Sequence, residues 1–272
     1  MFKLLASDFD NTLAYKWKIP GDNVKSIKKL QGSGIDFALV SGRPYSNIKH
    51  IFKKYGLDGH IIANNGAIVC DRTKGLICDF PMDKEEVRKL IDICLREKWI
   101  FLFYSMDTCF LPGGPLQRFL HKILAGLVKK ITGVGLKSFY PDKDLSDYPD
   151  FYKMNIYAPG PKADELRDRI NQEGKLSATR SGYKMIEIMN AGVNKWEGLS
   201  CLIDDLGLSV EETAAIGDYD NDVEMLKHAG LSFAVANASP TAKEAGKMSV
   251  GGVREGGFGQ AVDILLEKRR EA

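Results

Sequence analysis

Two aspartates one residue apart, Asp8 and Asp10, directly follow the apolar run of residues 2–6, and Thr12 comes two residues later. The apolar run predicts a buried strand that ends at the first carboxylate. A carboxylate can attack a phosphate ester as a covalent nucleophile when it shares a divalent cation with the phosphoryl group. Taken alone, the segment is equally typical of an acidic turn that caps a strand.

Three later segments carry residues that suit phosphate or metal chemistry. They are Ser41, Gly42 and Arg43, then Lys195, then the acidic loop of residues 217–222 with Asp218, Asn221 and Asp222. The first segment offers a hydroxyl and backbone N–H groups to a phosphate oxygen. The second is a point charge suited to phosphate, and the third can bind a hard cation through oxygen ligands.

An alternation of strands and helices is expected to position these segments. Strands are predicted at 2–6, 37–40, 61–63, 213–216 and 233–235, and helices at 22–30, 45–55, 195–206 and 222–228. Such alternation predicts a parallel sheet with right-handed crossovers. The carboxyl ends of its strands form a ligand crevice, so we expect the four segments to meet there.

The pattern changes between about residues 82 and 188. Helices are predicted at 83–98, 116–131 and 161–172, and strands at 100–104, 151–157, 176–180 and 184–189. This predicts a separate α+β unit inserted into the first domain. Its helix 116–131 is basic and amphipathic, and we expect it to bury its apolar stripe on a sheet. Membrane-surface binding is the alternative for that helix.

Composition sets further limits on function. The chain has 272 residues, 44% of them hydrophobic, and a net charge of +2, so nothing indicates a nucleic-acid partner. No apolar run approaches the roughly 20 residues that span a bilayer, and a strand begins too early for a signal peptide. The five cysteines form no CxxC pair, which predicts reduced thiols in a soluble cytoplasmic protein.

The four segments in this order resemble the motifs of the haloacid dehalogenase (HAD) superfamily of phosphohydrolases. The large insert between the second and third motifs resembles the Cof-type branch (subfamily IIB) with its C2 cap, and Asn64-Asn65-Gly66-Ala67 fits a motif of that branch. The resemblance covers essentially the whole chain. It implies an α/β fold with a Rossmann-like parallel-sheet core at 1–81 and 189–272, and an α+β C2 cap at 82–188.

The resemblance also implies a role for each matching residue. Asp8 is the nucleophile, and Asp10 is the general acid and then the base. Mg²⁺ is held by Asp8, Asp10 through its backbone carbonyl, Asp218 and Asp222. Phosphate or substrate contacts are implied for Thr12, Ser41, Gly42, Arg43, Asn64, Asn65, Lys195 and Asn221. Asn11 and Trp196 depart from the family pattern, and we expect Trp196 to pack against the core rather than to shape the site.

The expected function is a Mg²⁺-dependent phosphatase of small phosphorylated metabolites, with sugar phosphates favoured, acting through an aspartyl phosphate. A sugar phosphomutase and a non-catalytic regulatory protein that binds a phosphorylated ligand are the alternatives. We expect a monomer or homodimer with no membrane or nucleic-acid partner. Arg180, Lys184 and Glu187 are candidates to reach the substrate from the cap.

Overall fold

The chain divides into two compact units. The structure is a computed structural model that describes residues 1–158, 160–180 and 185–271. Unit 1 comprises Met1–Arg43, Ile51–Cys78 and Asn194–Ala272, and unit 2 comprises Pro44–His50 and Asp79–Val193. The sequence-based division at 81/82 and 188/189 differs from these limits by a few residues at each junction, and it lacks the short segment Pro44–His50.

Unit 1 is built on an eight-stranded sheet with the order β14-β13-β12-β1-β2-β3-β4-β5. Its strands are β1 (Leu4–Ser7), β2 (Asp36–Val40), β3 (His60–Ala63), β4 (Ile68–Asp71), β5 (Gly75–Asp79), β12 (Thr213–Gly217), β13 (Leu231–Val235) and β14 (Met248–Val250). The six strands from β14 to β3 pair in parallel, whereas β4 runs antiparallel to β3. The predicted α/β class with a Rossmann-like core is confirmed.

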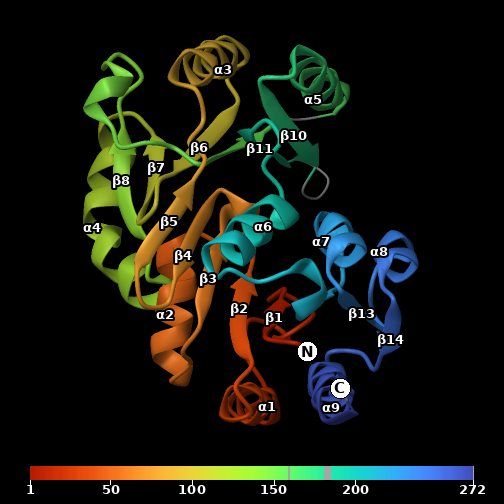
Figure 1. Cartoon of the computed structure of the whole chain (residues 1–272). Coiled ribbons are helices and arrows are strands. Elements are labelled where there is room, and N and C mark those ends of the chain that lie inside the picture. Colours follow the sequence, from red (N-terminus) through yellow and green to blue (C-terminus); the bar gives the residue numbers. More distant parts are fainter. Residues whose placement is uncertain (159, 181–184, 272) are drawn as a thin grey trace. The chain divides into compact units, whose positions relative to one another are not determined.

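Helices cover this sheet because its central strands are mostly apolar and are buried on both faces. They are α1 (Gly21–Gly32), α2 (Tyr45–Tyr55, of which residues 51–55 belong to unit 1), α6 (Lys195–Asp205), α7 (Val223–His228), α8 (Pro240–Ala245) and α9 (Gly257–Glu271). Every residue of β1, β12 and β13 is buried, as expected for parallel strands covered on both faces. Helices α1 and α9 lie together at the lower end of Figure 1, and Phe258 of α9 packs edge-on against Phe37 of β2.

The register of the three central strands brings their carboxyl ends level. Ser7, the last residue of β1, pairs with Leu39 of β2 and with Ile216 of β12. The residues that follow these strands therefore emerge at one edge of the sheet. This is where the sequence places the first, second and fourth motifs.

Unit 2 is an α+β fold around a six-stranded sheet with the order β10-β11-β9-β6-β7-β8. The strands are β6 (Ile100–Tyr104), β7 (Thr108–Pro112), β8 (Gly135–Phe139), β9 (Lys153–Tyr157), β10 (Leu176–Arg180) and β11 (Met185–Asn190), and the helices are α3 (Lys84–Glu97), α4 (Pro115–Thr132) and α5 (Pro161–Glu173). Alternate residues such as Phe103, Met154 and Ile188 form a hydrophobic core with apolar side chains of α3 and α5. The intervening positions Lys153 and Asn155 point to the opposite face of the sheet.

Helix α4 does not bury its apolar stripe, so that prediction was wrong. None of its residues is fully buried, and its large apolar side chains are exposed. The helix instead turns its polar and small residues toward β8, where His121 bonds Ser138 and Arg118 lies over the ring of Tyr140. An apolar stripe predicts the face that packs on the sheet, but in α4 the opposite face does so.

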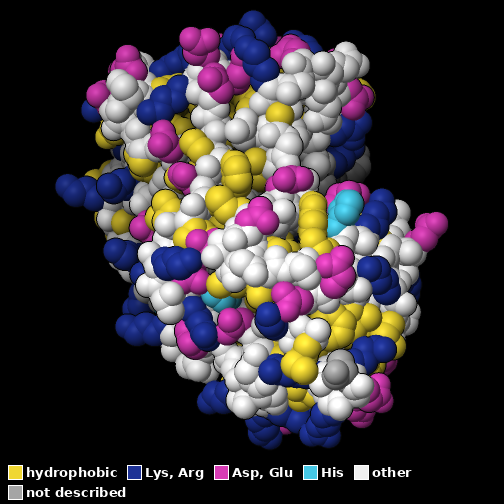
Figure 2. Space-filling view, in the orientation of Figure 1, with side chains coloured by type: hydrophobic (Ala, Val, Ile, Leu, Met, Phe, Trp, Pro, Cys, Tyr) yellow, Lys and Arg dark blue, Asp and Glu magenta, His cyan; other side chains and the backbone are white. Residues whose placement is uncertain are grey.

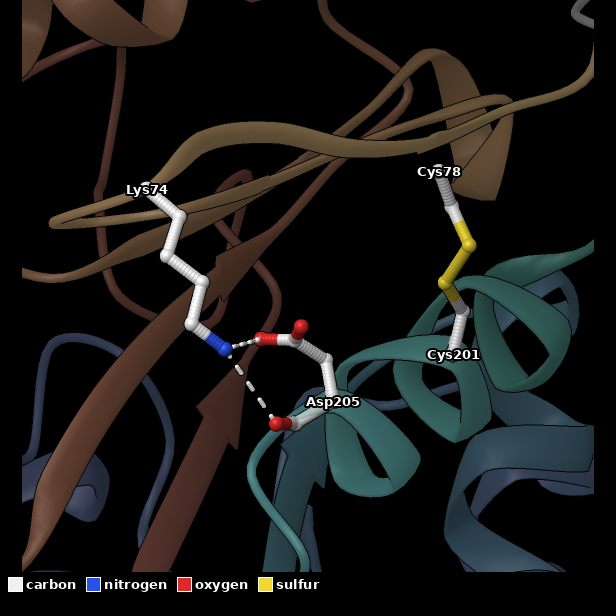
Figure 3. The surroundings of a disulfide bond; sticks show 4 residues. All are labelled: Lys74, Cys78, Cys201 and Asp205. Atoms are coloured by element: carbon white, nitrogen blue, oxygen red, sulfur yellow. Dashed lines mark hydrogen bonds and ion pairs between the residues drawn. A yellow bond between two sulfur atoms is a disulfide. The ribbon is translucent and has the colours of Figure 1, made fainter.

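The prediction of five reduced cysteines was also wrong. Cys78 in β5 and Cys201 in α6 form a disulfide that joins two distant segments of unit 1 (Figure 3). Nearby, Lys74 and Asp205 link the same two segments through an ion pair with an N–O distance of 2.8 Å. Cys94 and Cys109 are buried free thiols, and burial raises the pKa of each to about 12.

The surface carries charges of both signs. In the face drawn in Figure 2, Lys and Arg side chains are interspersed with Asp and Glu side chains, as the sequence predicts. Among the residues that the structure describes, no helix combines the length and apolar character required to cross a bilayer.

Candidate active site

Asp8 begins the site at the carboxyl end of β1. Its backbone N–H donates to the carbonyl oxygen of Ile216, at 2.9 Å, so the parallel ladder with β12 continues one residue past the strand. Its side chain is almost completely buried, at 5% exposure for the residue. The fold therefore fixes the position of this carboxylate through backbone hydrogen bonds and encloses it at the sheet edge.

Lys195, the first residue of α6, lies between two carboxylates. Its Nζ is 2.6 Å from Oδ1 of Asp8 and 2.6 Å from Oδ1 of Asp222, and all three side chains are buried. Burial alone would lower the pKa of Lys195, but the two carboxylates outweigh it and raise the pKa above its ordinary value. The lysine is therefore a permanent buried cation next to Asp8.

The start of α6 is fixed by a cap that sequence reasoning did not single out. The side chain of Asn194 accepts hydrogen bonds from the backbone N–H groups of Trp196 and Glu197, at 2.8 and 3.1 Å. Asparagine directly before a helix is a common N-cap, and that pattern could have revealed it. Trp196 is partly buried and stacks on His228 with ring centroids 5.0 Å apart; that it packs against the core rather than shaping the site stays a prediction.

The acidic loop after β12 is held by its own last carboxylate. Oδ2 of Asp222 accepts the backbone N–H groups of Asp218 and Tyr219, at 2.9 and 3.0 Å. A Cβ atom on Gly217 would lie 2.6 Å from side-chain atoms of Asp222, so only glycine fits at this turn. Thr12 donates to Oδ1 of Asp218 at 3.0 Å and thus connects the first motif to this loop.

Three carboxylates converge at a potential metal site. Asp8, Asp218 and Asp222 each offer an oxygen, and these atoms lie within 4.8 Å of one another. Burial raises the pKa of Asp8 well above its ordinary value, even though Lys195 opposes the shift. Burial, with repulsion from Asp222, raises the pKa of Asp218 to about 6. One lysine cannot balance three buried carboxylates, so the donor set suits a hard divalent cation.

The side chain of Asp10 lies outside this group and is held by Arg43. The guanidinium donates to both carboxylate oxygens, at 2.8 Å from Nε and 2.7 Å from a terminal nitrogen. Arg43 also lies over the rings of Phe9 and Trp17, with distances of 4.7 and 4.5 Å to the ring centroids. Asp10 and two aromatic rings therefore orient Arg43, which the sequence predicts as a phosphate ligand. The sequence did not predict these contacts with Phe9 and Trp17.

Ser41, Gly42, Asn65 and Asn221 meet beside the carboxylates. The backbone N–H of Asn65 donates to the carbonyl of Ser41 at 2.9 Å, and Oδ1 of Asn65 accepts from Nδ2 of Asn221 at 3.1 Å. A Cβ on Gly42 would lie 2.8 Å from Oδ1 of Asn65, so glycine is required for this close approach. Asn65 thus links the second motif, through its backbone N–H, to the fourth motif, through its side chain.

Asn64 is fully buried at the end of β3, with a φ of 47° in the left-handed region. Its backbone N–H donates to the carbonyl of Arg43 at 2.9 Å. Its two side-chain amide atoms are buried and have no hydrogen-bond partner among the residues that the structure describes. Because unpaired buried amides are costly, these atoms are suited to a polar group that binds there.

The candidate cap charges lie in unit 2 and differ from one another. Arg180 is paired with Asp164 at 3.1 Å and is partly exposed, which suits a structural role. Glu187 in β11 lies 3.7 Å from Nζ of Lys153, a buried lysine of β9. Lys184 lies outside the described residues.

Comparisons with known proteins agree with this geometry. A family model of haloacid dehalogenase-like hydrolases matches residues 5–262. The 5-amino-6-(5-phospho-D-ribitylamino)uracil phosphatase YwtE of Bacillus subtilis is 28% identical, over 97% of this chain and 98% of its own. The HMP-PP phosphatase of Yersinia pestis is 26% identical, over 90% of this chain and 87% of its own.

A solved structure supports the fold. The crystal structure of a haloacid dehalogenase-like hydrolase from Bacteroides thetaiotaomicron matches with a TM-score of 0.82 and 23% identity, over 97% of this chain and all of that one. The chain therefore belongs to the haloacid dehalogenase-like hydrolases, as the motifs indicated. Both of these curated relatives are named as phosphatases.

Proposed function

We propose that this chain hydrolyses phosphate monoesters of small metabolites through a phosphorylated Asp8, with Mg²⁺ as its cofactor. The observation that carries the proposal is the arrangement around Asp8. The carboxylate contacts Lys195 at 2.6 Å and shares a buried cluster with Asp218 and Asp222. This arrangement provides a nucleophile, a fixed cation and oxygen ligands at one edge of the sheet.

In the first step, an oxygen of Asp8 attacks phosphorus and forms an acyl phosphate bond. The bond between phosphorus and the ester oxygen breaks, and the protonated carboxyl of Asp10 gives its proton to the departing alkoxide. Arg43 holds both oxygens of Asp10, which fixes the direction in which this carboxyl group faces.

In the second step, water attacks the phosphorus of the aspartyl phosphate. Asp10, now ionised, takes a proton from that water, and the bond between phosphorus and Asp8 breaks to release inorganic phosphate. Dividing the displacement in two lets the same carboxyl serve as acid and then as base. Lys195 remains charged throughout and offsets the negative charge that develops on the phosphoryl oxygens.

Asp8, Asp218 and the backbone carbonyl of Asp10 would hold the Mg²⁺ ion, which supplies charge neutralisation and polarises the phosphoryl group. Asp222 has a supporting role, because Lys195 and two backbone N–H groups occupy its oxygens. Thr12 keeps Asp218 oriented. We assign phosphate contacts to Ser41 and to the backbone N–H of Gly42.

Sugar phosphates are our preferred substrate class. The YwtE relative is named for a substrate with a phosphorylated ribityl chain, which is a polyhydroxylated phosphate ester. In unit 2, the sheet face opposite α3 and α5 carries the buried side chains of Lys153 and Asn155, and the side-chain oxygen of Asn155 has no partner among the described residues. Such polar groups suit hydroxyls better than an apolar leaving group.

The test is a panel of sugar phosphates, nucleotides and cofactor phosphates with Mg²⁺, followed by release of inorganic phosphate. Asp8→Asn should abolish turnover while the circular dichroism spectrum stays unchanged. Asp220→Asn is the matched control, because this residue of the same loop pairs with Ser239 and Thr241 and should keep activity near wild type. Asp8→Asn activity within about tenfold of wild type would refute the nucleophile assignment.

The same panel separates the alternatives. A phosphomutase would convert one sugar phosphate into its isomer without releasing phosphate in proportion. A non-catalytic binding protein would show ligand-dependent stabilisation with no product from any compound. Either result would replace the proposal.

A further inference from the structure

The outward face of α4 carries a continuous stripe of large apolar side chains. The seven residues of this stripe are Leu116, Phe119, Leu120, Ile123, Leu124, Leu127 and Ile131, each between 44% and 70% exposed. They fall on one side of the helix, because they recur at intervals of three and four residues. We call this set the α4 stripe.

The helix is anchored in an orientation that keeps the α4 stripe outside. His121 lies 3.2 Å from the hydroxyl of Ser138 in β8, and the guanidinium of Arg118 lies 4.7 Å from the ring centroid of Tyr140. At its carboxyl end, the carbonyl of Thr132 accepts a hydrogen bond from the side chain of Asn47. Contacts at both ends of the helix therefore prevent it from rolling to bury the stripe.

The exposed area is that of one side of a stable protein interface. With side chains of this size each presenting on the order of 100 Å², the α4 stripe covers roughly 700 Å². The largest apolar patch on a monomeric protein is usually about 300–600 Å². A standard interface buries about 800 Å² on each partner, so two such stripes together supply a complete interface.

We propose that the α4 stripe is a homodimer interface in which α4 of one copy packs against α4 of a second copy. Leu116, Leu120, Ile123 and Leu127 are spaced alternately by four and three residues, as in the seam of two packed helices. A two-fold axis across the helices would bury the same stripe on both copies. The partner is thus a second molecule of this chain.

The charges around the stripe provide a way to test this choice of partner. Residues 108–141 contain no Asp or Glu but include Lys122, Lys129 and Lys130 on α4. In a homodimer these lysines repel one another, and salt should weaken that repulsion. An anionic lipid surface would instead attract them, so salt should weaken that binding.

The experiment is sedimentation velocity of the full chain from about 1 to 100 μM, at low and high salt. We expect a dimer of twice the 30.2 kDa chain mass, and the fraction of dimer should stay the same or increase at high salt. The double variant Ile123→Glu with Leu127→Glu should sediment as a monomer. Leu95→Glu is the matched control, because Leu95 of α3 is similarly exposed, at 48%, but lies outside the stripe.

The outcomes separate the proposal from its rivals. A wild-type dimer, together with a folded monomeric double variant and a dimeric Leu95→Glu variant, supports the α4 interface. A wild-type monomer at every concentration overturns it, as does a dimer that the double variant leaves intact. Binding of a monomer to phosphatidylglycerol-containing vesicles, lost at high salt, would assign the stripe to a lipid surface and also overturn the proposal.

Discussion

Replacing Cys201 with serine should destabilise the oxidised protein through the loss of a long covalent loop. The bond to Cys78 joins residues 123 positions apart, which places all of residues 79–193 within the loop. A cross-link lowers the entropy of the unfolded chain, and the chain-entropy relation gives about 5 kcal/mol for a loop of this length. The loop contains a unit with its own hydrophobic core, so residual structure there would reduce the effect to about 2–5 kcal/mol.

The measurement is equilibrium unfolding in urea, with and without a strong dithiol reductant. Oxidised wild type should lose about 2–5 kcal/mol on reduction and then match Cys201→Ser, because both lack the cross-link. Cys201→Ser should not respond to the reductant, which makes it the internal control. The ion pair of Lys74 and Asp205 cannot replace the bond, because an exposed pair contributes about 1 kcal/mol or less.

Two results would refute this reasoning. If reduction changed the unfolding free energy of wild type by less than about 0.5 kcal/mol, the cross-link would not constrain the unfolded chain as argued. If Cys201→Ser lost stability on reduction as wild type does, the effect would come from the reductant and not from this bond.

Three further predictions concern the core unit. Lys195→Met should lower turnover by about 10²–10³-fold or more. It should also destabilise the metal-free protein by about 3–5 kcal/mol, since it leaves Asp8 and Asp222 buried without a cation. Activity and urea unfolding measure the two effects, and full activity would contradict the role assigned to Lys195. Burial lowers the pKa of His60, so the proton binds preferentially to the unfolded chain and stability should fall as pH drops below about 6.5. Asp71 has a pKa lowered to about 2, so its contribution persists to lower pH. The raised pKa values of Asp8 and Asp218 act in the opposite sense, so the measurement is the difference in unfolding free energy between wild type and His60→Asn, and a difference that stays constant from pH 7 to 5 would contradict the role of His60. A divalent-metal chelator should abolish phosphate release, and added Mg²⁺ should restore it; activity that survives exhaustive chelation would exclude the metal site.

The sequence predicted most of the core because strong local signals agreed with one another. The apolar runs before Asp8, Ser41 and Asp218 are buried on both faces, and continuous runs of this kind predict parallel strands. The strands β4, β5, β7, β8 and β14 were missed. β5, β7 and β8 are partly exposed and lack a consistent apolar pattern, whereas β4 is buried but has only four residues and β14 has only three. The pairs of side chains that contact each other could not be predicted either. Asp10 and Arg43, for example, lie on two segments that only the tertiary fold brings together.

The two errors have a common physical origin. Periodicity along α4 identified an apolar stripe but could not show which face meets β8, because polar residues such as His121 can also pack there. Cysteine spacing likewise could not show that Cys78 and Cys201 become neighbours across 123 positions. In both cases the missing information was the arrangement of elements far apart in the chain.

The distribution of the proposed catalytic side chains between the two units has a further consequence. Asp8, Asp10, Lys195, Asp218 and Asp222 all belong to unit 1, whereas Lys153 and Glu187 belong to unit 2. Under the proposed mechanism, substitutions between residues 79 and 193 would therefore leave every bond-making group unchanged. A lineage could then gain activity toward new metabolites by changing one continuous stretch of its gene, while the proposed phosphoryl-transfer residues stayed the same.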